Sequence, residues 1–376
     1  MFAKTVAEFP AKGPAIPPKH IPTLDGWRAV AILMLLYGHA FGFAIRLPFN
    51  PAFCGVNLFF VLSGFLITYR LLTDYTKDGN VQFSKFYIRR VFRILPPAFT
   101  YLLCIYVLGI AGILPRWDRG IIAAALFARN YVSTPDNVQI AGWFTGHFWS
   151  LAIEEHFYLL WPLALHLAGM RRAKWVAVAG IVICFVWRLS AWHYGLGSSL
   201  NIPFYFRTDT RFDALLVGSL FGLAYASERT RTTLSNLLTK RDTTVLLILY
   251  GIVLLRMFEP ADLKELFLVG CMLAVTSLHP TSWLGKFLSL RPMRWIGQIS
   301  YSLYIWQQLL LGEGHQIFGR LGTFPLNILA TLTFATLSFY TVERFAIKAG
   351  YRLTAAKPKT ACVTEAATAS TGNSLS

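Results

Sequence analysis

Long apolar stretches recur from one end of the chain to the other and are separated by short polar or basic segments. Each stretch is close to the ~20 residues that a helix needs to cross about 30 Å of hydrocarbon. The pattern therefore predicts an all-α fold, that of a polytopic membrane protein with about ten transmembrane helices. The predicted segments are residues 27–46, 53–73, 98–114, 148–168, 174–194, 211–227, 243–258, 262–279, 295–312 and 324–345.

The composition agrees with this pattern. Of the 376 residues, 55% are hydrophobic and only 14% are charged, and the mean hydropathy is +0.50. A soluble domain carries about 25% charged residues. The five cysteines form no CxxC pair, and their spacing does not suggest a metal site. We therefore expect membrane lipid around the chain, no bound metal and no resident cofactor.

The net charge of +17 would suggest a nucleic-acid partner in a soluble protein, but in a membrane protein the basic residues report topology. With the N-terminus inside, 25 of the 35 lysines and arginines fall on segments assigned to the cytoplasm. This asymmetry predicts two cytoplasmic termini, an even number of crossings and no nucleic-acid binding. The predicted domains are a cytoplasmic segment at 1–22, a membrane domain at 23–350 and a disordered cytoplasmic tail at 351–376.

The first apolar segment contains two residues that membrane helices normally exclude, Arg28 and His39. Their spacing of eleven residues is close to three helical turns, so both side chains lie on one helix face, about 16 Å apart. An ionisable group at bilayer depth costs about 2.5–3.5 kcal/mol, which favours a functional role beside a cavity. The alternative is that Arg28 extends to the lipid headgroups and that His39 is a neutral interior histidine.

A second polar group enters the apolar segment 148–168, where Glu154 and Glu155 are adjacent. Neighbouring helical residues point about 100° apart, so the two glutamates face different sides of the helix. Glu154 shares its face with Ser150 and Tyr158, whereas Glu155 shares its face with leucines and a proline. We expect Glu154, Ser150 and Tyr158 to line an interior cavity. The alternative is that the glutamates only mark the aqueous end of the helix.

His39 and Glu154 are predicted at similar depths, about 10 Å and 9 Å below the outer face at 1.5 Å per residue. The two side chains could therefore meet in one site. Arg211 and Asp213 open the sixth predicted helix on the same side and could complete that site. The alternative for this pair is a role as caps or interfacial charges, which is common at the start of a helix.

Three arginines, Arg89, Arg90 and Arg93, lie within two helical turns on the predicted cytoplasmic side. Spacings of three and four residues place them in one patch. Guanidinium forks match the geometry of phosphate oxygens, so the patch is a candidate site for a phosphate-bearing ligand. The alternative is that it only orients the chain and binds anionic lipid.

The ordered combination of these motifs resembles the membrane-bound acyltransferase family 3. The stretch Thr23–Ala31 followed by His39 is similar to the family's opening motif, a basic residue and a histidine separated by ten residues. The stretch Gly55–Leu66 resembles the second motif, and Val342–Glu343 resembles the closing motif. Further matches are the Arg90/Arg93 pair, the stretch Trp149–Pro162, the Arg211/Asp213 pair and the stretch Ile299–Trp306. The resemblance covers residues from about 20 to 350.

The resemblance implies about ten helices in the plasma (bacterial inner) membrane. It also implies transfer of an acyl group, usually acetyl, from cytoplasmic acyl-CoA to a hydroxyl of a cell-surface or lipid-linked carbohydrate. Asn57, Ser300 and Tyr301 lie within the matching motifs and are further site candidates. Three positions depart from the pattern: Asn57 stands where the family often has Asp, His156 where Gln is common, and Gln307 where His usually follows the tryptophan.

Acyl transfer to a hydroxyl needs a base for the hydroxyl proton and hydrogen-bond donors for the developing oxyanion. His39 suits the role of base because imidazole titrates near neutral pH, and Glu154 could orient its ring. Asp213 is a further catalytic candidate. Arg28 and the arginine patch would hold the pantetheine end and the phosphates of acyl-CoA. Both direct transfer and an acyl-His39 intermediate are compatible with this arrangement.

A transporter or exporter of a sugar-containing substrate is the alternative from another class, because inward-facing His, Glu, Asp and Arg also form transport pathways. The sequence shows no internal repeat, and its arginine patch suits a phosphate-bearing donor, so both features favour the enzyme. For an enzyme, the alternative acceptor is a small glycosylated natural product. The sequence does not distinguish between these acceptors.

Overall fold

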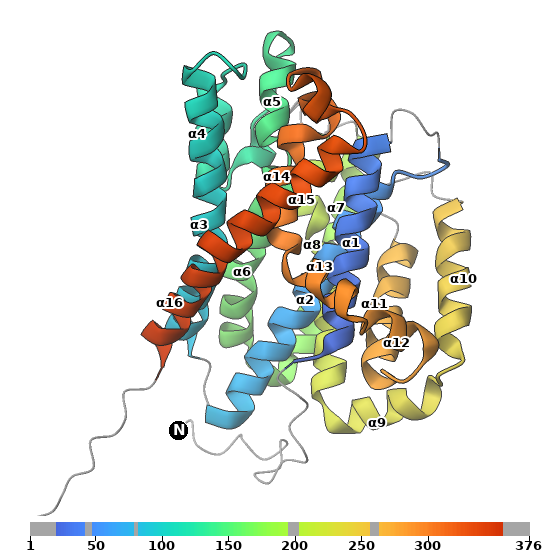
Figure 1. The fold of residues 1–376 in the computed structure, drawn as a ribbon. Helices are drawn as coiled ribbons and strands as arrows, with labels where there is room; N and C mark the ends of the chain where they lie inside the picture. The colour runs from blue at the N-terminus through green and yellow to red at the C-terminus, as the bar shows by residue number, and fades with distance from the viewer. Residues whose placement is uncertain (1–19, 42–46, 79–81, 195–202, 256–262, 356–376) are drawn as a thin grey trace, which may run out of the picture.

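The computed structural model describes residues 20–41, 47–78, 82–194, 203–255 and 263–355. Every regular element within these ranges is helical, which confirms the all-α prediction. Figure 1 shows a tall bundle in which most of the long helices follow one common direction. The long helix α15–α16 crosses the front of this bundle obliquely.

The apolar stretches of the sequence form the long helices. These are α1 (Pro22–Phe41), α2 (Pro51–Asp78), α3 (Phe83–Ile110), α6 (Phe148–Ala168), α7 (Ala173–His193), α8 (Thr208–Ala226), α10 (Asp242–Leu255), α11 (Leu263–Leu278), α14 (Ser300–Leu310) and α15 (Leu326–Ser338). Shorter helices connect or flank them. They are α4 (Asp118–Ala125), α5 (Gln139–Gly146), α9 (Glu228–Leu237), α12 (Trp283–Leu288), α13 (Arg291–Gln298) and α16 (Arg344–Thr354).

Three segments within the described ranges are long and apolar enough to cross a membrane: Pro51–Thr76, Phe83–Ile110 and Met170–Ala191. Their length and composition support a membrane protein. In Figure 1, α1 begins and α16 ends in the lower half of the bundle, the arrangement that an even number of crossings would give. The number of ten crossings and the cytoplasmic position of the termini stay predictions.

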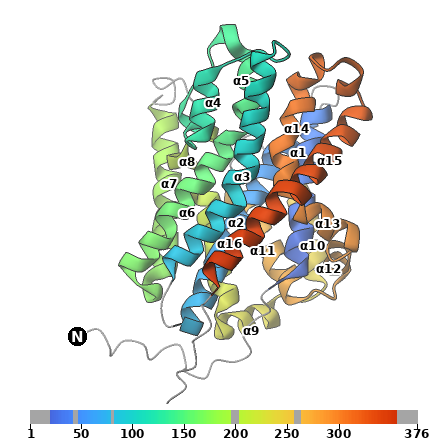
Figure 2. The ribbon, with the colours of Figure 1, turned by 60° about the vertical axis from the view of Figure 1, so that its left-hand side comes forward.

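Several predicted segments have different bounds in the structure. The segment 98–114 belongs to α3, which begins at Phe83, so the arginine patch lies within a long helix rather than before it. The segment 295–312 is divided at Ile299 into α13 and α14. The short helix α13 packs against α1, whereas α14 lies beside both α1 and α15 (Figure 2).

The last predicted segment, 324–345, is the beginning of a longer helix. A π-helical turn at Phe339–Glu343 joins α15 to α16, which ends at Thr354. The predicted tail from residue 351 therefore begins a few residues too early, because residues 351–354 are helical. The remainder of that tail, residues 356–376, lies outside the described residues, as do residues 1–19 and 42–46.

Helix α2 lies at the centre of the fold, where it packs against α1 and α8. Glycines allow α2 and α8 to approach closely. A side chain at Gly64 would collide with the carbonyl group of Leu215, and one at Gly218 would collide with that of Val61. Close approach at small residues is a common basis of helix packing in membranes. It fixes the position of Ser63, which is the neighbour of Gly64 and faces the cavity described next.

Candidate active site

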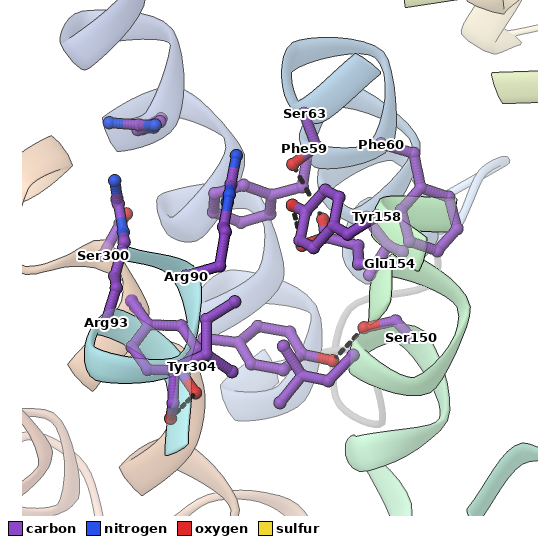
Figure 3. A pocket seen from close by; sticks show the side chains of 15 residues that line it. Phe59, Phe60, Ser63, Arg90, Arg93, Ser150, Glu154, Tyr158, Ser300 and Tyr304 are labelled. Atoms are coloured by element: carbon purple, nitrogen blue, oxygen red, sulfur yellow. Dashed lines mark hydrogen bonds between the residues drawn. The ribbon is translucent and has the colours of Figure 1, made fainter. Parts of the chain in front are cut away.

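A cavity lies between α1, α2, α3, α6 and α14, with about 670 Å³ of empty space that is partly open to solvent. Figure 3 shows side chains from several of these helices pointing toward a common centre. The lining residues are Arg28, Val56, Phe59, Phe60, Ser63, Arg90, Arg93, Ile94, Ser150, Leu151, Glu154, Tyr158, Ser300, Tyr301 and Tyr304.

Three guanidinium groups line the cavity, those of Arg28, Arg90 and Arg93. Arg28 lies 3.5 Å from the Asp25 carboxylate, and the guanidinium of Arg90 stacks 4.2 Å from the centre of the Tyr158 ring. Within the described part of the chain, neither Arg90 nor Arg93 forms an ion pair with a carboxylate. Figure 3 shows these two side chains extending from α3 in the same direction. The arrangement can therefore accept an anionic group with two guanidinium forks.

Glu154 is the carboxylate among the lining residues. Ser63 donates a hydrogen bond of 2.9 Å to Glu154 Oε1, and Tyr158 donates one of 2.8 Å to Oε2 (Figure 3). Its neighbour Glu155 does not line the cavity, so the two glutamates face different sides as helical spacing predicts. Because Tyr158 also stacks on Arg90, Glu154 helps to fix the position of that guanidinium.

Ser150 and Tyr304 are joined by a hydrogen bond of 2.6 Å between their hydroxyl groups (Figure 3). Tyr304 donates its one hydroxyl proton to a hydrogen bond of 2.6 Å with the backbone carbonyl of His147. In the hydrogen bond between Ser150 and Tyr304, Ser150 is therefore the donor. Tyr301 donates to the carbonyl of Ile94 at 2.8 Å and ties α14 to α3. Hydroxyl groups are thus held in defined positions along the cavity wall.

His39 is not among the residues that line the cavity. Its Nδ1 lies 2.7 Å from Gln307 Oε1, and its ring contacts the Trp143 ring edge-on with a centroid distance of 5.4 Å. Its hydrogen-bond partner is therefore Gln307 and not Glu154. The expected meeting of His39 and Glu154 is not what the structure shows, because Glu154 lies with Arg28, toward the opposite end of α1.

The reason is the length of the segment that carries Glu154. Helix α5 stands above α6 in Figure 1, and only His147 separates the two helices. The helical path therefore begins at Gln139, nine residues before Phe148, which places Glu154 about 13 Å deeper than a start at Phe148 would.

Arg89 and Asp213 are also outside the cavity lining. Arg89 donates to Thr354 Oγ1 at 2.8 Å and stacks on Tyr351, so it joins α3 to α16. Asp213 accepts a hydrogen bond of 2.7 Å from Arg188 on α7. Adjacent helical positions diverge by about 100°, which separates Arg89 from Arg90, and positions two apart diverge by about 200°, which separates Asp213 from Arg211.

Arg211 and Asn57 belong to a second polar group, which we call the sealed cluster: Asn57, Arg211 and Glu265. All three residues are fully buried. Arg211 donates to Asn57 Oδ1, and Asn57 Nδ2 donates to Glu265 Oε2 at 2.6 Å. The guanidinium of Arg211 also lies 5.6 Å from the ring centre of Phe60, which lines the cavity. Neither Asn57 nor Arg211 lines the cavity.

Sequence reasoning did not select Ser63, Tyr304 or Glu265, and it noted Gln307 only as a departure from the family pattern. Ser63 is the polar residue inside an apolar run, and Tyr304 follows Ser300 by four residues, so helical spacing could have indicated both. Within the described part of the chain, no group of three His, Cys, Asp or Glu side chains converges as a metal site.

Comparison with known proteins adds independent evidence. A family model described as an acyltransferase domain matches residues 21–343. The chain is 31% identical over 375 residues to "Putative peptidoglycan O-acetyltransferase YrhL" of Bacillus subtilis, covering 89% of this chain and 56% of that protein. It is 29% identical over 365 residues to the peptidoglycan O-acetyltransferase OatA of Listeria monocytogenes, covering 89% and 57%. It is 27% identical over 366 residues to the O-acetyltransferase OatA of Staphylococcus aureus, covering 91% and 60%.

The chain thus spans just over half the length of these curated relatives. No solved structure matches it. The family model covers the residues that line the cavity, the sealed cluster and His39. The chain therefore belongs to the family of membrane acyltransferase domains that its motifs resemble.

Proposed function

We propose that the protein is an integral, multi-pass membrane O-acyltransferase of the bacterial inner membrane that moves an acetyl group from acyl-CoA to a hydroxyl of a cell-surface carbohydrate. The observation that carries the proposal is the cavity, in which the guanidinium groups of Arg28, Arg90 and Arg93 face a single carboxylate. This excess of positive charge suits an anionic, phosphate-bearing donor. The names of the relatives favour peptidoglycan as the acceptor.

In this proposal the arginines bind the phosphates of the donor, and the thioester extends along α1 toward His39. Arg28 and His39 are eleven residues apart, roughly 16 Å along the helix, a separation that the extended pantetheine arm bridges. The acceptor approaches His39 from the opposite end. The donor and acceptor would thus reach the reaction centre from different sides.

His39 acts as the base in the proposed step. The acceptor oxygen forms a bond to the acyl carbon while its proton moves to His39 Nε2, and the carbon–sulfur bond then breaks. The proton passes from His39 to the thiolate, so CoA leaves as the thiol. Glu154 contributes at the donor end, through Tyr158 and Arg90, rather than by orienting the imidazole.

The test measures acetyl transfer from labelled acetyl-CoA to peptidoglycan fragments in membranes that contain the protein, with mass spectrometry of the product. His39→Ala is expected to reduce turnover by about 10²–10⁴-fold, the usual contribution of a positioned base, at normal abundance. The matched control is His166→Ala, because His166 is an exposed histidine on α6. Turnover near that of the wild type in His39→Ala would show that His39 is not the base. Movement of an unmodified sugar across the membrane without acyl-CoA would favour a transporter.

A further inference from the structure

Gln307 is a fully buried residue on α14 whose side chain contacts His39 on α1, 268 positions away in the sequence. The distance from Gln307 Oε1 to His39 Nδ1 is 2.7 Å. The other polar atom of the amide, Nε2, has no hydrogen-bond partner among the described residues. Leaving a buried donor unpaired costs free energy. Within the described part of the chain, His39 is the hydrogen-bond partner of the Gln307 side chain.

The imidazole is also held on a second side. Trp143 packs edge-on against the His39 ring, and its indole nitrogen donates to the backbone carbonyl of Gln308 at 2.9 Å. Helix α14 thus fixes the position of the His39 ring through two contacts. One is the side chain of Gln307, and the other is the backbone carbonyl of Gln308, which binds Trp143. His39 Nε2 has no hydrogen-bond partner within the described part of the chain, so this nitrogen is the one available for chemistry.

We propose that Gln307 is the positioning residue for His39, and that its Oε1 accepts a hydrogen bond from Nδ1–H and so fixes the tautomer in which Nε2 carries the lone pair. This inference rests on the proposed function, because it assigns the nitrogen that acts as the base. An amide that donated to Nδ1 through its NH₂ group would leave the proton on Nε2 and block the reaction.

The neutral amide differs from the carboxylate of a Ser-His-Asp triad in one respect. Both accept a hydrogen bond from Nδ1–H and orient the ring, but only the carboxylate adds a full negative charge beside the imidazolium that forms. Gln307 therefore supplies orientation with weaker electrostatic stabilisation. A carboxylate at this position should keep the orientation and strengthen the base.

The neighbouring residue Gln308 provides a structural contrast. Its Oε1 lies 2.7 Å from His147 Nδ1 and also accepts a hydrogen bond of 3.1 Å from the backbone nitrogen of His147. This contact fixes the junction between α5 and α6, where His147 is fully enclosed. Gln307 makes no such backbone contact, which separates a positioning role from a purely structural one.

The experiment compares Gln307→Met, Gln307→Glu and Gln307→His in the acetyl-transfer assay, with kcat, KM for acetyl-CoA and the pH profile of kcat. Gln307→Met removes the acceptor atom and is expected to lower kcat at least ~10-fold, a part of the 10²–10⁴-fold contribution of a positioned base, without changing KM. Gln307→Glu keeps only acceptor atoms and should retain turnover, with the acidic limb of the profile moved to higher pH. Gln307→His offers a ring nitrogen as acceptor and should recover part of the loss.

Gln298→Met is the matched control, because Gln298 is an exposed glutamine on the adjacent helix α13. Wild-type kcat in Gln307→Met would overturn the positioning role. Equal inactivity of the Met, Glu and His variants at normal abundance would also overturn it, since acceptor atoms would then not restore activity. If His39→Ala is inactive while Gln307→Met is normal, only this inference fails. If His39→Ala is active, the proposed function fails first.

Discussion

The cavity and the sealed cluster both contain arginine, half-buried in the cavity and fully buried in the cluster, and they differ in charge balance and in access. In the cavity, Arg28, Arg90 and Arg93 share one lining carboxylate, and the space beside them is open to solvent. In the sealed cluster, Arg211 and Glu265 are joined through the amide of Asn57, and no solvent reaches them. The comparison indicates that arginines inside the bundle point to a ligand only where neighbouring carboxylates do not balance their positive charge.

The balance of the sealed cluster explains the departure at position 57. A carboxylate is already present at Glu265, so an amide at Asn57 can accept from Arg211 and donate to Glu265 at the same time. An aspartate at position 57 could accept from Arg211 but would face Glu265 with a second negative charge. Asparagine thus fits a cluster whose carboxylate comes from α11.

Among these substitutions, those in the sealed cluster should change the stability of the protein most. Asn57→Asp should destabilise the protein by about 3–5 kcal/mol, the range for an uncompensated buried charge, and lower its abundance. The double variant Asn57→Asp/Glu265→Gln should recover most of that loss, because the carboxylate and the amide then exchange places. Thermal unfolding of the purified protein measures both. Wild-type stability in the single variant would show that the cluster is not charge-balanced as described.

Substitution of the cavity arginines should weaken binding of acetyl-CoA without affecting folding. Arg90→Gln/Arg93→Gln should raise KM for acetyl-CoA by about 10²-fold, since hydrogen bonds to charged groups contribute about 1.5–3 kcal/mol each. Arg89→Gln is the matched control, because Arg89 lies on the same helix and contacts α16 instead of the cavity. An equal rise in KM for Arg89→Gln would remove the distinction between adjacent arginines.

The smallest of these effects concerns the two glutamates of α6. Glu154→Gln should lower kcat/KM for acetyl-CoA about 10-fold, because it weakens two hydrogen bonds to a charged acceptor and loosens Tyr158 beneath Arg90. Glu155→Gln should keep most of the activity, since Glu155 does not line the cavity. Steady-state kinetics of both variants give the comparison, and equal losses would contradict the assignment of Glu154 alone to the site.

Helical periodicity predicted several of the polar side chains that line the cavity. Arg28, Arg90 and Arg93 were singled out as unusual cations, and spacing chose Glu154 over Glu155. This worked because each choice depends on the face of one helix, which the 3.6-residue repeat determines. The local sequence therefore determines which side chains of each helix can face the cavity.

The contacts between helices were not predictable in the same way. The depth of Glu154 was wrong because the short stretch Gln139–Gly146, which forms the helix α5, was not recognised as a continuation of the helix before Phe148. The partners of His39 and Asn57, which are Gln307 and Glu265, lie 268 and 208 positions away, and no local spacing relates them. Such pairs depend on how helices pack, and a single sequence contains no periodic signal for them.

The π-helical turn at Phe339–Glu343 determines how the last helix is rotated. Glu343, the last residue of the turn, accepts a hydrogen bond of 2.7 Å from Ser302, and beyond the turn Thr354 accepts a hydrogen bond from Arg89. A π turn contains one residue more than the corresponding α-helical turn, so removing a single residue there would rotate α16 by about 100° relative to α15. The contact between Thr354 and Arg89 thus depends on the number of residues in this turn and not on their chemical type, so a deletion of one amino acid would be more disruptive than most substitutions.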